Sequence, residues 1–245
     1  MKIGFLGSGK MAHGILSAMT DASAALLSSV EDNHNVEIAQ TCELLFLAVR
    51  PQDVDSVAAE VKPFLTAKQT VVSIVAGKTL RKLRRALGAK VNLIRVMPNL
   101  ALRAGAGMCA ICPGPKAPRR HLSEVERILG GAGATVVLKE RDFDAVTALS
   151  GSGPAYFAYM EEAMMEGGIA LGLKPAVARL LAEQTMYGTA KFLRESQMPL
   201  KPFIDGVCTK GGTTAAGMKH LATPSFKKIV AKTLAAAAQR SKELA

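Results

Sequence analysis

The feature that most constrains the fold is a short apolar run at the N-terminus that leads directly into a glycine-rich loop. Lys2 to Leu6 form the run, and Gly7-Ser8-Gly9-Lys10-Met11-Ala12 follows with the pattern Gly-x-Gly-x-x-Ala. Apolar residues then recur at the spacing of a helix. The order strand, glycine loop, helix is typical of a parallel sheet that holds a dinucleotide, because the glycines allow a tight turn and a close approach of the pyrophosphate. The alternative is a tight strand-helix turn without a ligand.

Four further apolar runs are predicted to be buried strands: Leu44 to Val49, Thr70 to Val75, Asn92 to Val96 and Gly107 to Cys112. Helical patterns separate the first few of these runs, which indicates βαβ units and a parallel sheet. Ligands of such sheets bind at the carboxyl ends of the strands. The turns that follow the strands are therefore expected to line a cofactor cleft: Arg50-Pro51, Ala76-Gly77 and Met97-Pro98-Asn99. Alternatively, Arg50 and Asn99 are ordinary surface-turn residues.

The segment between the glycine loop and the strand predicted at Leu44 is short for a domain of this kind. About thirty-five residues separate the glycine loop from Leu44, whereas a helix, a second strand, a second helix and their connections need around fifty. Either Leu26 to Val30 is a surviving second strand, or that strand and its helix are absent. A residue at the end of this strand would contact the ribose 2′-position of the cofactor. The available acidic candidates, Asp21, Glu31 and Asp32, leave the choice between NADH and NADPH open.

The pattern changes at Pro154 to long amphipathic stretches. Helices are predicted over Tyr156 to Leu171, Pro175 to Arg194 and Ser225 to Leu244, with Gly172 as a C-terminal cap. Their small, Ala-rich faces indicate core packing and suggest helix-helix dimerisation. The expected fold is α/β, with a Rossmann-type parallel-sheet domain over residues 1–143, shortened around its second strand, and an all-α dimerisation domain over 144–245.

Two loops rich in glycine and hydroxyl groups interrupt the helical half. The first reads Thr-Ala-Leu-Ser-Gly-Ser-Gly-Pro-Ala-Tyr from Thr147 to Tyr156, and the second reads Lys-Gly-Gly-Thr-Thr from Lys210 to Thr214. Successive amide groups of such loops form anion-binding nests, and the hydroxyls add donors and acceptors. We interpret the loops as half of a binding site for a small carboxylate ligand.

Composition argues against several other functions. The net charge is +11, but the basic residues are spread along the chain. The densest cluster, Arg81 to Arg85, has no interleaved aromatic residues and indicates the solvated face of a short helix rather than a nucleic-acid surface. No run of eighteen apolar residues occurs, so no membrane span is predicted, and a cytoplasmic location is expected.

The cysteines and histidines do not suggest a metal site. Cys109 and Cys112 have the Cys-x-x-Cys spacing, but in a strand they would point to opposite faces, and no second pair completes a zinc site. The histidines match no catalytic motif and are expected at the surface: His13, His34, His121 and His220. Hydride transfer fits this inventory, because the cofactor carries the difficult step.

Together these motifs resemble those of the pyrroline-5-carboxylate reductases, which make proline by hydride transfer to a cyclic imine. The resemblance covers nearly the whole chain through Gly7 to Ala12, Ala48 to Gln52, Ser73 to Gly77, Arg95 to Asn99, Leu149 to Tyr156 and Gly211 to Thr214. It implies an N-terminal Rossmann domain, a helical domain that intertwines with a partner subunit, and a site between the two. It also implies NADPH as the reductant, with NADH as the alternative, and a homodimer or higher oligomer.

The resemblance assigns roles to individual residues. Thr147 stands where family members have a proposed hydroxyl proton donor, and Ser150 is expected to bind the substrate. The substrate carboxylate would bind the loop formed by Thr209, Gly211, Gly212, Thr213 and Thr214. The cofactor would contact Gly7, Ser8, Gly9, Lys10, Met11, Ala48, Val49, Arg50, Pro51, Ala76 and Asn99.

The chain departs from the family pattern in places. Lys10 and Arg50 replace the usual Asn and Lys, Leu100-Ala101 replaces Thr-Pro, and Thr209-Lys210 replaces Ser-Pro before the glycine pair. The main hypothesis is therefore an NAD(P)H-dependent reductase of 1-pyrroline-5-carboxylate. The alternatives are a reductase of another small imino or 2-keto acid, suggested by these substitutions, and a non-catalytic dinucleotide-binding paralogue, suggested by the shortened segment.

Overall fold

The computed structural model describes residues 1–19 and 33–245, and between them residues 25–28 by their backbone. These residues divide into two compact units. The sheet unit comprises Met1–Pro154 together with Ala236–Ala245, and the helical unit comprises Ala155–Ala235. We describe each unit by itself. The boundary between functional domains that the sequence suggests, between residues 143 and 144, stays a prediction.

The sheet unit is built on seven strands in the order β2-β1-β3-β4-β5-β6-β7. All neighbouring strands run parallel except β5 and β6, which pair antiparallel. The strands are β1 (Ile3–Leu6), β2 (Ala25–Ser28), β3 (Leu44–Leu47), β4 (Thr70–Ser73), β5 (Asn92–Pro98), β6 (Gly107–Pro113) and β7 (Gly133–Val137).

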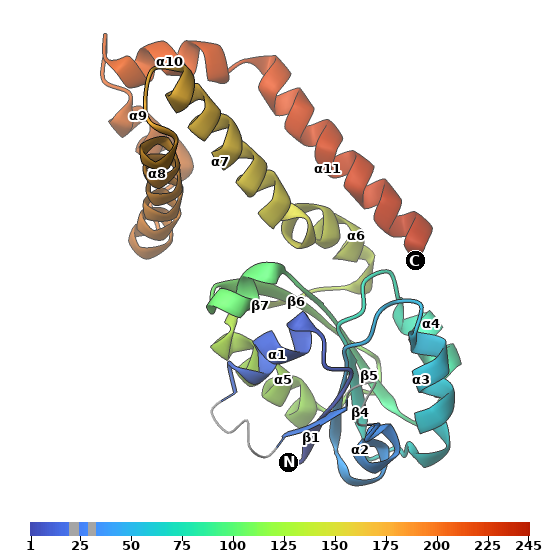
Figure 1. Cartoon of the computed structure of the whole chain (residues 1–245). Helices are drawn as coiled ribbons and strands as arrows, with labels where there is room; N and C mark the ends of the chain where they lie inside the picture. The colour runs from blue at the N-terminus through green and yellow to red at the C-terminus, as the bar shows by residue number, and fades with distance from the viewer. Residues whose placement is uncertain (20–24, 29–32) are drawn as a thin grey trace. The chain divides into compact units, whose positions relative to one another are not determined.

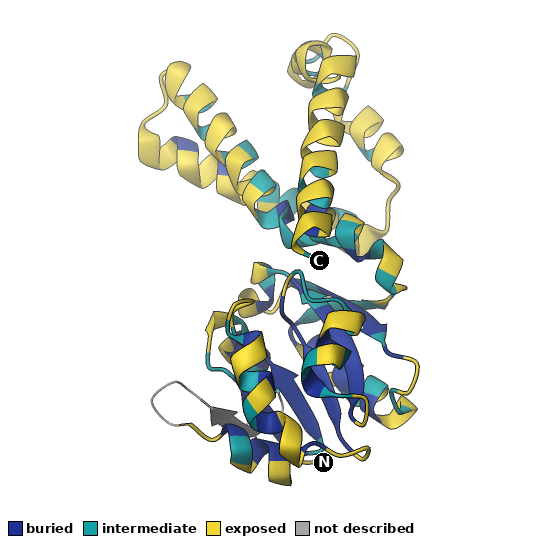
Figure 2. Ribbon diagram, turned by 90° about the vertical axis from the view of Figure 1, so that its right-hand side faces the viewer, coloured by how far each residue is buried: buried dark blue, intermediate teal, exposed yellow. Residues whose placement is uncertain are grey.

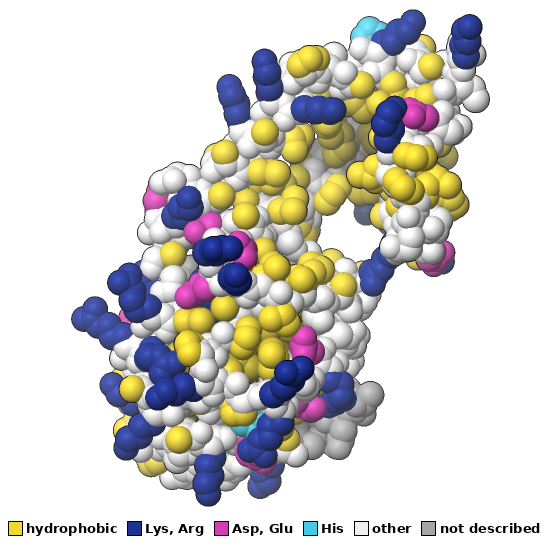
Figure 3. Space-filling model, turned by 180° about the vertical axis from the view of Figure 1, so that it is seen from behind, with side chains coloured by type: hydrophobic (Ala, Val, Ile, Leu, Met, Phe, Trp, Pro, Cys, Tyr) yellow, Lys and Arg dark blue, Asp and Glu magenta, His cyan; other side chains and the backbone are white. Residues whose placement is uncertain are grey.

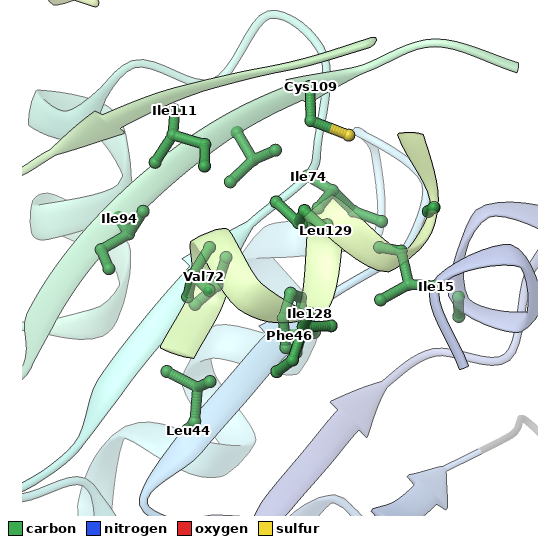
Figure 4. Close-up of a cluster of buried hydrophobic side chains, with 14 of the residues drawn as sticks. Ile15, Leu44, Phe46, Val72, Ile74, Ile94, Cys109, Ile111, Ile128 and Leu129 are labelled. Atoms are coloured by element: carbon green, nitrogen blue, oxygen red, sulfur yellow. The ribbon is translucent and has the colours of Figure 1, made fainter. Parts of the chain in front are cut away.

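Helices cover both faces of this sheet (Figure 1). Because successive strand residues point to opposite faces, Phe46 and Leu45 of β3 enter different cores. The core that contains Phe46 is closed by α1 (Lys10–Leu16) and α5 (Arg119–Gly131), as Figure 4 shows. The core that contains Leu45 is closed by α2 (Asn35–Thr41), α3 (Val54–Val61) and α4 (Leu80–Leu87).

Short helical segments complete the sheet unit. They are the 3-10 turns η2 (Lys62–Phe64), η3 (Leu100–Ala104) and η4 (Glu140–Asp142), the single turn α6 (Phe143–Val146) and the π-helical turn η5 (Thr147–Gly151). The helix α4 has Leu83 and Leu87 buried and Arg81 and Arg85 exposed, which confirms the solvated basic face expected for this segment.

The parallel sheet expected from the sequence is confirmed, with one antiparallel pair, β5 with β6. Residues 99–106 connect β5 to β6 with a short 3-10 turn, and a parallel crossover needs a dozen or more residues. The last strand, β7, was not predicted; it pairs parallel with β6 after the crossover helix α5.

The open question about the second strand is answered by the backbone. Strand β2 is present, pairs parallel with β1, and is followed by α2. The expected Leu26 to Val30 is thus an actual strand with the bounds Ala25–Ser28. The candidates for the ribose contact, Asp21, Glu31 and Asp32, lie outside the described residues.

The regular structure of the helical unit consists of helices. The helices α8 to α10 lie wholly within the unit, whereas the first residues of α7 and the last residues of α11 are assigned to the sheet unit. Their bounds are α7 (Gly153–Ala170), α8 (Pro175–Ser196), α9 (Leu200–Val207), α10 (Thr213–Leu221) and α11 (Pro224–Leu244). The three long helices were predicted, and Gly172, at φ 97°, ends the first of them as expected. The short α9 and α10 were not predicted.

The interiors of the two units differ greatly (Figure 2). Within residues 155–235, all of which are described, only Ala178 and Ala182 are buried. Both lie on α8 one turn apart, and Ala178 faces Gly168 of α7, where a Cβ on the glycine would come within 3.3 Å of the alanine Cβ. Large apolar residues of the same unit, including Leu171 at 88% exposure, lie at the surface of the chain (Figure 3).

The cysteine pair lies as expected. Cys109 and Cys112 both belong to β6, and they enter different apolar clusters on opposite faces of the sheet. Burial raises the pKa of the Cys109 thiol to about 11 and also raises that of Cys112. Both side chains are therefore packed as neutral thiols at neutral pH.

The expectation for His121 was wrong. Its side chain is buried on α5, where Val125, Ile128 and Leu129 follow it at helical spacing on the core-facing side. Nδ1 lies 2.6 Å from the hydroxyl of Thr70 on β4, and Nε2 has no hydrogen-bond partner among the described residues. Burial and the nearby Arg120 lower the pKa of the imidazole. His13, His34 and His220 are exposed, as expected.

Candidate active site

The sheet topology itself marks a ligand position. In the parallel part, the order β2-β1-β3-β4-β5 reverses direction between β1 and β3. The loops after two such strands diverge over opposite faces of the sheet and leave a crevice between them. A groove of about 580 Å³ lies there, lined by Gly7, Ser8, Gly9, Asn33, Asn35, Ala48, Val49, Arg50, Asp53, Ser56 and Val57. Six of the residues predicted to bind the cofactor thus share one groove.

The glycines of this groove have distinct physical roles. Gly7 has φ 105°, and a Cβ there would come within 2.8 Å of the Ala48 carbonyl oxygen, so both conformation and space require glycine. A Cβ at Gly9 would meet only that same oxygen, at 3.8 Å, which is ordinary contact. The fold therefore does not demand glycine at position 9, and the open space there suits a group that approaches the backbone closely. This cradle fits the pyrophosphate of a dinucleotide.

The other predicted cofactor residues lie around this groove or beyond it. Lys10 is exposed and begins α1, whereas Met11 packs against the core beneath that helix. Pro51 and Ala76 are exposed in the turns after β3 and β4 and do not line the groove. Parallel strands present these turns at the same edge of the sheet.

Sequence reasoning missed the polar wall of the groove. Asn33 and Asn35 donate to the two carboxylate oxygens of Glu60 on α3, each at 2.8 Å. Arg50 donates from Nε to Asp53 at 2.8 Å and is the only Lys or Arg among the described lining residues. The spacing of Arg50 and Asp53 at the start of α3 was a usable signal, but the link from Asn33 and Asn35 to Glu60 depends on tertiary packing.

A second cluster lies where β5 ends, at the same edge of the sheet. Asn99 is held by Met108, because its backbone N–H donates to the Met108 carbonyl at 3.1 Å and its Oδ1 accepts from the Met108 N–H at 3.1 Å. This arrangement orients Nδ2 toward the hydroxyl of Ser150, which accepts from it at 3.4 Å. The hydroxyl proton of Ser150 is then available to another acceptor. Two residues predicted from separate motifs are thus in contact.

Thr147 begins the π-helical turn η5 that carries Ser150. Its hydroxyl donates to the carbonyl of Phe143 at 2.7 Å, and its own carbonyl accepts from the Ser152 N–H at 2.8 Å. Wide turns of this kind often occur at functional sites. The hydroxyl is half-buried, and turning its O–H bond would redirect the proton without moving a heavy atom.

In the helical unit, the loop before α10 presents free amide groups. Gly211 has φ 75°, and the N–H of Gly212 donates to the Thr209 carbonyl at 2.9 Å. A Cβ on Gly212 would collide with the Thr209 hydroxyl and come within 3.1 Å of the Thr209 carbonyl oxygen, so little space is left there for a side chain. Gly212 caps α10 without a side-chain hydrogen bond, and Thr213 and Thr214 begin the helix exposed. No acidic residue lies in that first turn, so the loop can accept an anion.

Comparison with known proteins connects these features to one family. A family model described as pyrroline-5-carboxylate reductase dimerisation matches residues 140–244, and one described as NADP oxidoreductase, coenzyme F420-dependent, matches residues 2–77. The pyrroline-5-carboxylate reductase of Synechocystis is 38% identical over 210 residues, which cover 86% of this chain and 78% of the relative. The chain belongs to the pyrroline-5-carboxylate reductase family.

Other relatives extend the match to the whole chain. The Arabidopsis thaliana pyrroline-5-carboxylate reductase is 32% identical, with 99% of this chain and 95% of the relative covered. The Coxiella burnetii enzyme structure has a TM-score of 0.92 at 28% identity, covering 100% and 98% of the two chains. A Plasmodium falciparum pyrroline carboxylate reductase solved with NADP bound gives 0.87 at 28% identity and the same coverage. This protein is accordingly an oxidoreductase with a Rossmann-type domain.

Among the described residues, no group of three or more His, Cys, Asp or Glu side chains is placed to hold a metal ion. No helix within the described ranges is long and apolar enough to cross a membrane.

Proposed function

We propose that this protein reduces 1-pyrroline-5-carboxylate to proline with NADPH, the final step of proline biosynthesis. The observation that carries the proposal is the contact between Asn99 and Ser150 beside Thr147, at the same sheet edge as the glycine groove. Family membership supports the reaction, and the NADP-bound relative supports the cofactor.

The groove between β1 and β3 is assigned to the dinucleotide. Gly7 and Gly9 would admit the pyrophosphate, and Ser8 would donate from its hydroxyl. Arg50 would contact a phosphate from the other wall, where its guanidinium pairs with Asp53, the residue before α3. When bound, the nicotinamide supplies the hydride for the substrate's imine carbon.

The polar cluster at the end of β5 is assigned to the imine. As the hydride forms a new C–H bond, the C=N π pair moves to the ring nitrogen, which keeps or takes up one proton and becomes the amine. Thr147 would deliver or stabilise that proton, and Asn99 would orient Ser150 so that its hydroxyl donates toward the substrate. Fixed donors of this kind lower the barrier because they need no reorientation during the reaction.

The loop from Thr209 to Thr214 is assigned to the substrate carboxylate. Free amides at the start of α10 point along its axis, and the absence of a side-chain cap leaves them for a ligand. Lys210 adds a positive charge where the family pattern has proline. The assignment predicts that the carboxylate-free imine 1-pyrroline reacts poorly.

A homodimer completes the proposal. The family model for dimerisation matches the helical part of the chain, and the apolar helix surfaces of the helical unit need a partner surface to bury them. A second copy of the chain is the partner that the family model indicates. The cytoplasmic location expected from the sequence stays a prediction, which cell fractionation would test.

The experiment is a steady-state assay that follows the loss of NADPH absorbance with 1-pyrroline-5-carboxylate, six-membered cyclic imines and small 2-keto acids as substrates. We expect turnover with 1-pyrroline-5-carboxylate and a clear preference over the others. A preference for a larger ring would indicate that the enzyme acts on a different imine, as the substitutions at Leu100 and Lys210 suggest. Cofactor binding by calorimetry without turnover on any substrate would instead identify a non-catalytic paralogue.

A further inference from the structure

Strand β5 presents a row of alternate side chains to the segment that carries Thr147. Arg95, Met97 and Asn99 point to one face of the sheet, while Ile94 and Val96 enter the core on the other face. Each member of the row has a partner in residues 140–151. Arg95 contacts Glu140 and Phe143, Met97 lies against Gly151, and Asn99 donates to Ser150.

Arg95 is the member with the most demanding surroundings. It is only 4% exposed, and a buried guanidinium is costly unless it is paired and hydrogen-bonded. Its Nη1 donates to Glu140 at 3.1 Å, and its guanidinium lies over the Phe143 ring, 4.7 Å from the ring centroid. In some proteins, buried charges of this kind fix one arrangement of neighbouring segments.

Glu140 joins a third segment to the pair. The same carboxylate oxygen that receives Arg95 also accepts from the Leu80 N–H at the start of α4, at 2.6 Å. One carboxylate thus ties the strand, the helix start and the η4 turn that leads into α6. The exposed pair of Glu124 and Arg127, by contrast, joins two residues one turn apart on α5.

The path from this pair to Thr147 is short. Phe143, whose ring lies under Arg95, supplies the carbonyl that receives the Thr147 hydroxyl at 2.7 Å. The ring is buried, so its position fixes the first turn of α6 and with it the Thr147 Oγ1 atom. Met97 and Asn99 independently hold the far end of η5, the turn that Thr147 begins, through Gly151 and Ser150.

We propose that Arg95 and Glu140 are positioning residues, which form a clasp that sets the Thr147 hydroxyl through Phe143. This inference rests on the proposed reductase function for its kinetic readout. Neither residue touches the reacting atoms in this scheme. Their removal shifts Thr147 away from its working position and slows the proton-transfer step, while the glycine groove keeps its affinity for the cofactor.

The test uses Glu140→Gln in the full-length protein, with Glu124→Gln as the matched control. Glutamine keeps an oxygen for the Leu80 N–H but removes the charge opposite Arg95. We expect kcat to fall about tenfold with the KM for NADPH unchanged, since small misplacements of catalytic groups have effects of this size. The control should keep the kcat of the original chain. An unchanged kcat in Glu140→Gln overturns the proposal.

A double-mutant cycle separates positioning from general loosening of the fold. If the clasp acts through Thr147, Glu140→Gln will cause little further loss of kcat in a Thr147→Val background. Losses that multiply would show that Glu140 acts by another route and would overturn the proposal. Arg95→Lys is the second variant, because it keeps the positive charge but loses the planar group over Phe143. We expect it to lower kcat by less than Glu140→Gln does.

Hydrogen exchange provides a readout that does not need turnover. The Ser152 N–H, which donates to the Thr147 carbonyl, should exchange about tenfold faster in Glu140→Gln and at an unchanged rate in Glu124→Gln. If the original chain shows no reductase activity, the proposed function fails, and this measurement still decides the clasp. Equal exchange in both variants overturns the clasp even where the enzyme is active.

Discussion

The sheet unit and the helical unit solve the same problem, the burial of apolar side chains, in different ways. In the sheet unit, both faces of the strands are covered, and Phe5, Phe46 and Leu45 are fully buried. In residues 155–235 only two alanines are buried. The first unit therefore contains its own core, whereas the second leaves its large apolar side chains exposed in the single chain.

The α8 helix shows this difference within one element. Ala178 and Ala182 occupy the side that packs within the unit, and the larger Val177, Leu180, Leu181 and Tyr187 form a stripe on another side. Small residues let the helices approach each other closely, but they bury little area. Within this helix, the small residues therefore make the contacts inside the unit, and the large apolar residues lie on a face that is exposed in the single chain.

The largest expected effect comes from charging that stripe. Leu180→Glu together with Tyr187→Glu would place two carboxylates at positions that are 65% and 60% exposed in the single chain. If a second copy covers this face, burial of the charges abolishes the dimer, since unpaired buried charges are not tolerated. Sedimentation velocity should report a monomer, which would also be prone to aggregate.

The control for this experiment is Lys68→Glu together with Lys90→Glu, which places two carboxylates at exposed positions of the sheet unit. It should leave the mass of the assembly unchanged. A double variant that stays as large as the original chain would contradict the view that this face of α8 is a partner surface.

A second prediction concerns the glycine groove of the sheet unit. Gly7→Val combines a positive φ with a collision against the Ala48 carbonyl, so we expect a loss of roughly 1–3 kcal/mol in the free energy of unfolding. NADPH affinity should fall at least a hundredfold. Gly9→Ala has no such collision, so its melting temperature should stay the same while its NADPH affinity still falls.

The contrast between these two variants is the informative result. Thermal melting and calorimetric titration with NADPH would be measured on both proteins. Unimpaired NADPH binding in Gly9→Ala would remove this loop from the cofactor site.

A third prediction concerns Thr147. Thr147→Val replaces the hydroxyl by a methyl group of similar size, and we expect kcat to fall roughly a hundredfold, the usual contribution of one proton donor. The KM should change less, because a proton donor acts mainly in the transition state. Thr147→Ser should restore much of the rate. An unchanged kcat in Thr147→Val would remove this residue from the mechanism.

The smallest expected effect lies in the sheet core, at His121. Burial and Arg120 lower the pKa of this imidazole below its ordinary 6.5, with Glu43 opposing them more weakly and Thr70 bonded to Nδ1. The unfolded chain therefore binds a proton more readily than the folded one. Stability is complete above pH 6.5 and is lost as the pH falls below that value, by at most about 1.4 kcal/mol per pH unit.

Urea unfolding between pH 5 and 8 would measure this dependence, with His121→Asn as the variant and His220→Asn as the exposed control. The His121 variant should be less sensitive to pH in the acidic range, whereas the control should follow the original chain. Parallel curves for all three proteins would show that His121 does not link stability to pH.

Most of the sheet could be predicted from the sequence, because a strand that is buried on both faces consists of a continuous run of apolar residues. The exceptions have physical causes. Strand β7 is half-exposed and contains Gly133, so it lacks such a run. The antiparallel step to β6 could have been inferred from the few residues between Pro98 and Gly107, which cannot hold a crossover helix.

The site was readable only where a motif fixed the local backbone. The glycines and the Asn99 turn were found from their neighbours in the chain, and their common sheet edge followed from the parallel strands. The Arg95–Glu140 pair joins residues that are 45 positions apart, and no local sequence pattern predicts it. His121 was predicted to lie at the surface because it matches no catalytic motif. Its helical spacing from Val125 and Ile128 would have placed it on the core face of α5.

The central claim is that the groove between β1 and β3 and the cluster at the end of β5 together reduce a cyclic imino acid. Stopped assays with 1-pyrroline-5-carboxylate and NADPH deuterated at the transferred position, followed by mass spectrometry of the product, test it most directly. The account predicts proline that carries one deuterium on the former imine carbon. Absence of labelled proline with either NADPH or NADH, from protein that is folded and binds the cofactor, would contradict it.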